Sequence, residues 1–276
     1  MRNLWDAVLR AAGPREFSAL VNDEVVRLPR ELRGLVGVDR GERQGIYFEW
    51  QAMLGLIAVL RPGMTAFDVG CSYGILTCLI SRMVGEAGFV HAFEANSEVV
   101  EWTARTIQLN AIESRVRLTC CCVGESSGGE VEFFRVPGAG SVASTRNAEI
   151  LKFHAAAESE PIPLLSLDDY CATIERAPDC LKIDVEGSEC LVLRGARRLL
   201  ERHRPALVLE THGLEINGLG GDVGEVCGML DAAGYVLMDL TRREFVTAAV
   251  YARRYERSIG YLLAWELDKM LSPVTR

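Results

Sequence analysis

The chain has 276 residues, a formal charge of −8 and 49% hydrophobic residues, which is the composition of a folded globular protein. A wholly disordered chain is excluded, and the length favours one domain of roughly 200 residues with a smaller extension. An acidic chain without a long basic run is a poor partner for nucleic acid, because such binding depends on neutralising phosphates.

Cysteine usage and hydropathy bear on the compartment. None of the nine cysteines has the C-x-x-C spacing of a zinc or redox site, so we expect reduced thiols that pack as small hydrophobic residues. The sequence shows no basic-then-apolar leader and no apolar stretch long enough to span a membrane. We therefore expect a cytoplasmic protein without a membrane partner.

The first part of the chain differs in pattern from the rest. Leu4–Ala12 suits a short helix, and Phe17–Leu28 alternates around a turn at Asn22–Asp23, as a hairpin does. We assign residues 1–46 to an N-terminal cap of helix and hairpin and residues 47–276 to one larger domain. The larger domain opens with a helix from Phe48 that stops before Pro62.

Strands and helices then alternate along the chain. The predicted strands are Thr65–Gly70, Gly88–Glu94, Val116–Val123, Cys180–Val185, Pro205–Glu210, Val236–Leu240 and Tyr261–Glu266, and the helices between them are Ile75–Val84, Ser97–Asn110 and Cys190–Arg202. Continuous apolar strands separated by helices predict an α/β fold with a mostly parallel sheet covered on both faces.

A long excursion, residues 124–174, interrupts this alternation. It holds a hairpin-like segment, Glu130–Phe134, and a loop of small residues around Ser141 and Ser144. Connections of this length in a compact sheet are usually functional. We predict a substrate loop in which Ser141 and Ser144 bind the substrate; a flexible polar linker is the alternative.

The segment Asp68-Val-Gly-Cys-Ser-Tyr-Gly74 joins the first strand of the sheet to a helix. Its glycines allow a tight turn, and the helix start presents free N–H groups to a ligand. Glu94 ends the next strand, 20 residues past Gly74 (94 − 74 = 20). An acid in that place accepts hydrogen bonds from ribose hydroxyls. The pair of features predicts a nucleoside-containing cofactor, either a dinucleotide or S-adenosylmethionine.

The glycine spacing separates these two cofactors. A dinucleotide turn needs Gly-x-Gly-x-x-Gly, but position 72 is Ser. Asp68, two residues before the first glycine, would repel a pyrophosphate and would suit the cationic tail of S-adenosylmethionine. An NAD-dependent oxidoreductase is therefore the less favoured reading.

At this point the chain resembles a known family. The segments that carry the resemblance are Phe67–Gly74, Phe93–Asn96, Leu181–Glu189, Leu193–Ala196 and Arg204–His212. Together they are similar to the FkbM family of S-adenosylmethionine-dependent methyltransferases, over about residues 47–267. The resemblance implies the Rossmann-like class I methyltransferase fold with a mostly parallel seven-stranded sheet, and commonly O-methylation of sugars or secondary metabolites.

Site residues follow from the turn, the strand ends and the resemblance. The predicted cofactor-binding residues are Asp68, Gly70, Ser72, Gly74, Glu94, Ala95, Asn96, Val123 and Asp184. Asp184 should end one strand and Glu210 and His212 the next, so we expect these three to converge beside the transferable methyl group as catalytic residues. We assign Glu186 to substrate binding, with a helix N-cap as its alternative.

The predicted activity is O-methylation of a hydroxyl on a small polar molecule, a sugar or natural-product intermediate. His212 is the candidate general base, because an alcohol is a poor nucleophile until it is partly deprotonated. N-methylation of a small-molecule amine is the alternative, and a non-catalytic binding module is disfavoured by the intact cofactor motifs. The carboxylates at the strand ends are possible ligands for Mg²⁺, but we predict no metal site. We expect a homodimer as a candidate assembly.

Overall fold

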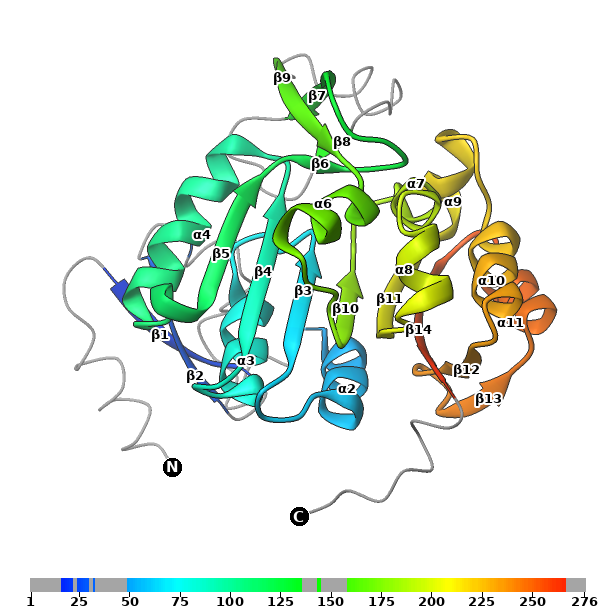
Figure 1. Cartoon of the computed structure of the whole chain (residues 1–276), viewed down its shortest axis with the longest axis horizontal. Helices are drawn as coiled ribbons and strands as arrows, with labels where there is room; N and C mark the ends of the chain where they lie inside the picture. The colour runs from blue at the N-terminus through cyan, green and yellow to red at the C-terminus, as the bar shows by residue number, and fades with distance from the viewer. Residues whose placement is uncertain are drawn as a thin grey trace, which may run out of the picture.

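The computed structural model describes residues 16–21, 24–29, 32, 49–135, 143–144 and 158–266. Its centre is an eight-stranded sheet with helices on both faces (Figure 1). The spatial order of the strands is β13 (Glu244–Val246), β12 (Val236–Asp239), β14 (Ile259–Trp265), β11 (Ala206–His212), β10 (Cys180–Ile183), β3 (Thr65–Val69), β4 (Phe89–Glu94) and β5 (Val116–Cys120).

Five neighbouring strands of this sheet, β11 to β5, run parallel, so their carboxyl ends lie at one edge. The strand β10 pairs with β3 on one side and β11 on the other, and the pairing with β11 agrees with the predicted convergence of Asp184, Glu210 and His212. The sheet has eight strands instead of the predicted seven. The additional strand, β13, pairs antiparallel with β12 because residues 240–243 turn the chain back on itself.

Successive residues of each buried strand point into two separate cores. Ala66, Val90 and Val208 belong to the first core, and Phe67 and Leu209 belong to the second. This alternation follows from the two-residue period of a strand, and both faces are apolar because helices cover both.

The helices divide between these two cores. The first face is covered by α2 (Trp50–Val59), α3 (Ile75–Val84) and α4 (Ser97–Leu109). The second is covered by α6 (Leu167–Ile174), α7 (Glu189–Arg194), α8 (Arg197–Arg202), α9 (Gly213–Gly218), α10 (Val223–Ala232) and α11 (Ala248–Tyr255). No helix in the described part of the chain is long and apolar enough to cross a membrane.

Two predicted elements are divided in the structure. The strand predicted over Val116–Val123 is two strands, because Cys121 donates its N–H to Glu94 and residues 122–123 turn away to join a smaller sheet. The helix predicted over Cys190–Arg202 breaks at Gly195. There the carboxylate of Asp168 accepts the N–H groups of Arg198 and Leu199 at 2.9 and 2.8 Å, which caps a new helix, α8.

The smaller sheet contains most of the described part of the predicted excursion, and Figure 1 shows it beyond the ends of β4 and β5. Its order is β6 (Cys122–Val123), β9 (Glu158–Leu165), β7 (Glu130–Arg135) and β8 (Ala143–Ser144). Arg135 of β7 ties it to α4 through an ion pair of 2.9 Å with Glu98. The predicted substrate residue Ser141 lies outside the described residues.

The predicted N-terminal hairpin is confirmed. Strand β1 (Glu16–Val21) pairs antiparallel with β2 (Glu24–Pro29), with Val21 opposite Glu24. Val26 and Leu28 are fully buried in the core shared with α3 and α4. The side-chain amide of Asn110 accepts the N–H of Arg27 and donates to its carbonyl oxygen. The predicted helix Leu4–Ala12 lies outside the described residues.

Candidate functional site

The turn between β3 and α3 holds its backbone against the neighbouring strand. Gly70 and Gly74 have φ angles of 76° and 78°, which glycine adopts at little cost. A Cβ on Gly70 would lie 1.7 Å from the carbonyl oxygen of Asp184, so no larger residue fits there. Ser72 between them has a φ of 47°, which is strained for a residue with a Cβ. Strain of this kind is concentrated at ligand-binding turns.

Glu94 at the end of β4 joins this turn to the start of α4. Its Oε2 accepts the N–H of Ser72 and its Oε1 accepts the N–H of Asn96, both at 2.9 Å. Burial raises the pKa of Glu94, and these hydrogen bonds oppose the rise. The side chain of Asn96 caps α4 by accepting the N–H groups of Glu98 and Val99. A carboxylate has about four acceptor positions, so Glu94 keeps capacity for ligand hydroxyls.

Asp68 is fully buried and is bound by the protein itself. Its Oδ2 accepts the hydroxyl of Thr77 at 2.6 Å, and its Oδ1 lies 3.3 Å from Nζ of Lys182. Lys182 in turn donates to the carbonyl oxygen of Gly70 at 2.7 Å and lies 3.5 Å from Asp184. Asp68 is therefore linked to the turn through Lys182, while its Oδ1 is buried without a hydrogen bond in the described structure.

Lys182 keeps its charge although it is buried. Burial opposes the charged form, but Asp68, Asp184 and Glu49 outweigh it and raise the lysine pKa well above its ordinary value. An ammonium in the middle of an apolar strand stabilises the fold only when such acids surround it. The charge is thus a fixed internal part of the site.

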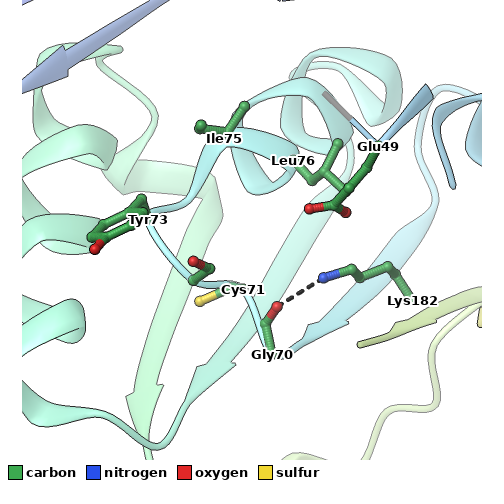
Figure 2. Close-up of a pocket in the computed structure, with 8 residues that line it drawn as sticks. Glu49, Gly70, Cys71, Tyr73, Ile75, Leu76 and Lys182 are labelled. Carbon is green, nitrogen blue, oxygen red and sulfur yellow. Dashed lines mark hydrogen bonds between the residues drawn. The ribbon is translucent and has the colours of Figure 1, made fainter. Parts of the chain in front are cut away.

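A small cavity of about 20 Å³ lies beside the turn. Gly70, Ser72 and Tyr73 line one side, and Glu49 and Lys182 line the other. Figure 2 shows the Glu49 carboxylate directed toward the amino end of Lys182, whose bond to Gly70 is dashed. Oε2 of Glu49 is buried and has no hydrogen-bond partner in the described structure.

A second group of polar side chains lies at the ends of β10 and β11. The imidazole of His212 is buried, and its Nδ1 lies 2.7 Å from Oε1 of Glu189. Its Nε2 lies 3.4 Å from Glu186, 3.6 Å from Glu210 and 3.9 Å from Asp184. The structure thus brings the three predicted catalytic residues and Glu186 together. Glu186 faces the imidazole, and α7 shows no side-chain N-cap bond.

These carboxylates control the ionisation of His212. Burial favours the neutral imidazole, but Glu189, Glu186 and Asp184 outweigh it and raise the pKa of His212 to about 10. Burial, with the charge of Asp184, raises the pKa of Glu210 to about 7. At neutral pH His212 is therefore an imidazolium and cannot accept a proton. This differs from the general-base role that we predicted for it.

The same side chains could hold a divalent cation. One ligand atom each from Asp184, Glu210 and His212 lie within 4.8 Å of one another. Glu189 would orient the imidazole as the carboxylates behind metal-bound histidines do. The protonated imidazole of His212 supplies a positive charge at the same place. It therefore balances part of the negative charge of the carboxylates without a metal.

The remaining predicted residues in the described part of the chain lie in or beside the smaller sheet. Ala95 follows Glu94 and packs with the smaller sheet. Val123 is buried in β6, where it pairs with Leu165 of β9. The backbone of Ser144 is in β8, opposite Phe134.

Three residues of the site were missed by sequence reasoning. The signal for Lys182 was a lysine inside an otherwise apolar strand, and Glu189 lies three residues after Glu186, within the recognised motif. Glu49 carried no signal, because it precedes a helix that is more than ten residues away from the glycine turn.

Strand order, glycine turn and the acid that ends β4 define a methyltransferase of the Rossmann-like class I type. A family described as the methyltransferase FkbM domain matches residues 68–237, which is more than half of the chain. The chain therefore belongs to this family, as the motifs at Phe67–Gly74 and Leu181–Glu189 predicted.

Comparison with individual proteins gives weaker likenesses. A curated protein of Thermoplasma acidophilum described as "Probable cobalt-precorrin-6B C(15)-methyltransferase (decarboxylating)" is 39% identical over 46 residues, which are 17% of this chain and 23% of that protein. The chain thus matches about a quarter of the length of this curated relative.

Two solved structures are also similar. A methyltransferase FkbM from Methylobacillus flagellatus is 18% identical, with a TM-score of 0.46 over 76% of this chain and 49% of that one. A SAM dependent methyltransferase from Aquifex aeolicus is 16% identical, with a TM-score of 0.42 over 77% and 88% of the two chains.

Proposed function

We propose that this methyltransferase uses S-adenosylmethionine to methylate a hydroxyl group of a small polar molecule, such as a sugar or a natural-product intermediate. One observation carries the proposal. The cluster of Asp184, Glu210 and His212 lies directly beside the glycine turn, since Gly70 packs against the backbone of Asp184. A cofactor in the turn would therefore present its methyl group to the cluster.

The residues of the turn fit this cofactor. Glu94 would accept hydrogen bonds from the ribose hydroxyls, and its two backbone bonds already hold it in place. Ser72, Gly74, Ala95, Asn96 and Val123 would surround the nucleoside, and Asp68 would act through Lys182. When bound, the cofactor supplies a methyl group on a positively charged sulfur, which makes the carbon electrophilic.

The chain then has to align the acceptor oxygen and remove its proton. With the cofactor bound, a carbon–oxygen bond would form as the carbon–sulfur bond breaks, and the hydroxyl proton would pass to a carboxylate of this chain. We assign that role to Glu210, which lies in β11 two residues before His212, at 3.6 Å from its imidazole. His212 and Glu186 would orient the acceptor, and the fixed imidazolium would stabilise the charge that develops on the oxygen.

An amine acceptor is a second candidate, and the charge of the cluster favours it. Four carboxylates surround the single imidazole, so the site attracts a cationic group. The two functions differ in their acceptors. Transfer of a labelled methyl group to hydroxyl compounds but not to matched amines is expected, and the opposite result would select N-methylation.

A further inference from the structure

One carboxylate oxygen of Glu49, Oε2, has no hydrogen-bond partner in the described part of the chain, although the residue itself is held in place. It is the N-cap residue of α2, and its carbonyl oxygen accepts the N–H of Met53 at 3.0 Å. Met53 and Leu56 anchor this helix in the first core. Oε2 is buried, and an acceptor that is buried without a hydrogen bond destabilises the protein. Such a group is expected to have a ligand.

The charges around Glu49 include three acids, Asp184, Glu210 and Asp68, and this surplus of negative charge favours a cation as its partner. Lys182 lines the same cavity, but its ammonium is already shared among Gly70, Asp68 and Asp184. Asp68, which precedes the turn, is fully buried, accepts the hydroxyl of Thr77 and lies 3.3 Å from Nζ of Lys182. Of these two acids, Glu49 is the one that lines the pocket beside Gly70 and Ser72, where a positively charged group could reach it.

We propose that Glu49 binds the α-ammonium group of the cofactor's amino-acid portion and so selects ligands that carry this group. The inference rests on the proposed use of S-adenosylmethionine. It assigns a binding residue that lies outside the segment matched by the family, residues 68–237. The role that the sequence suggested for Asp68 thus passes to an acid from a different element, α2.

Ionisation of Glu49 is expected to accompany binding. Burial raises its pKa to about 8, Lys182 opposes the rise, and Asp184, Glu210 and Asp68 add to it. At pH 7 the empty site therefore holds Glu49 mainly in its neutral form. A ligand ammonium favours the carboxylate, so binding should release a proton from this side chain.

The test compares ligands that differ only in the amino-acid portion. S-adenosylhomocysteine and 5′-methylthioadenosine share the adenosine and the thioether sulfur, but the second lacks the ammonium and carboxylate. Calorimetry should show that Glu49→Gln weakens S-adenosylhomocysteine about 10-fold to 100-fold, the loss typical of one charge-assisted hydrogen bond, and leaves 5′-methylthioadenosine unchanged. Decarboxylated S-adenosylmethionine, which keeps the amine, should show the same loss.

Two matched variants complete the experiment. Glu94→Gln should weaken both ligands, and Glu101→Gln, on the exposed face of α4, should weaken neither. In two buffers of different ionisation enthalpy at pH 7, wild-type protein should release close to one proton on binding S-adenosylhomocysteine, and Glu49→Gln should release none from this group.

The outcomes distinguish the two proposals. Equal losses for both ligands in Glu49→Gln, or no loss for either, would overturn the role of Glu49 while leaving the cofactor assignment intact. Failure of wild-type protein to bind any of these adenosine ligands would overturn the proposed function, and this inference with it.

Discussion

Nζ of Lys182 in β10 lies 2.7 Å from the carbonyl oxygen of Gly70 and so connects the glycine turn to the neighbouring strand. The same ammonium lies 3.3 Å from Asp68 and 3.5 Å from Asp184. One buried cation therefore joins the turn proposed to hold the cofactor to the first residue of the proposed catalytic cluster. Cofactor binding and the position of Asp184 should depend on each other through this side chain.

Removal of this cation should destabilise the protein strongly. In Lys182→Met, Asp68 stays buried without its counter-charge, and breaking a buried pair by removing one partner costs about 3–5 kcal/mol. Urea denaturation would measure this loss in the free energy of unfolding. The double variant Lys182→Met/Asp68→Asn should recover part of it. As a control, Arg198→Met removes an exposed ion pair with Asp169 and should cost less than about 1 kcal/mol. Equal losses in the two single variants would contradict this account.

Glu94 should determine affinity for the nucleoside. S-adenosylhomocysteine should raise the melting temperature, because a ligand that binds only the native state stabilises it. Glu94→Ala should cost about 1.5–3 kcal/mol of binding, since charge-assisted hydrogen bonds to the ribose would be lost. Thermal shift and calorimetry measure both effects, with NAD⁺ as the control ligand. Binding of NAD⁺ in place of S-adenosylhomocysteine would refute the cofactor assignment.

The pH dependence of methyl transfer should separate Glu210 from His212. Glu210 has to be ionised to accept a proton and its pKa is about 7, so the rate should rise with pH through about 7. Glu210→Gln should lower turnover by about 10²–10⁴-fold and abolish that step. His212→Ala should lower turnover through lost orientation but keep a titration step. Loss of the step in His212→Ala alone would restore His212 as the base.

Chelation should have little effect on activity. The imidazolium of His212 already places a positive charge among Asp184, Glu186 and Glu210, so we expect no dependence on a metal ion. EDTA treatment followed by assay with added Mg²⁺ is the measurement. Loss of activity with EDTA and rescue by Mg²⁺ would instead show that the acceptor is activated by a metal held in this cluster.

Glu49→Gln should change the pH dependence of stability. The pKa of Glu49 is about 8 in the folded protein against an ordinary value of 4.5, so folding favours the protonated form. Wild-type stability should therefore fall as the pH rises from about 4.5 to 8, and this contribution is absent in Glu49→Gln. The melting temperature of the variant should exceed that of wild type increasingly over this range. Parallel pH profiles would contradict the buried, unpaired state of Glu49.

Much of the fold could be predicted because its signals are local. Continuous apolar strands such as Thr65–Val69 and the tight turn at Gly70–Gly74 are encoded by adjacent residues, and the adjacency of β3, β10 and β11 followed from the fold class. Boundaries that depend on distant partners were wrong. The division between α7 and α8 depends on Asp168, about 30 residues earlier, which caps the second helix.

The sequence by itself determined the family and the positions of the acids at the strand ends, since Glu94, Asp184 and Glu210 stand in short motifs. Only the tertiary structure decided the protonation states and the partners of those groups. Glu189, Glu186 and Asp184, from a segment more than twenty residues earlier in the chain, make His212 a cation at neutral pH. Lys182 lies beside Asp68, and Glu49, which precedes a helix outside the motifs, lines the cavity. The reason is physical: a pKa depends on burial and on charges a few ångströms away, and those neighbours come from residues far apart in the chain.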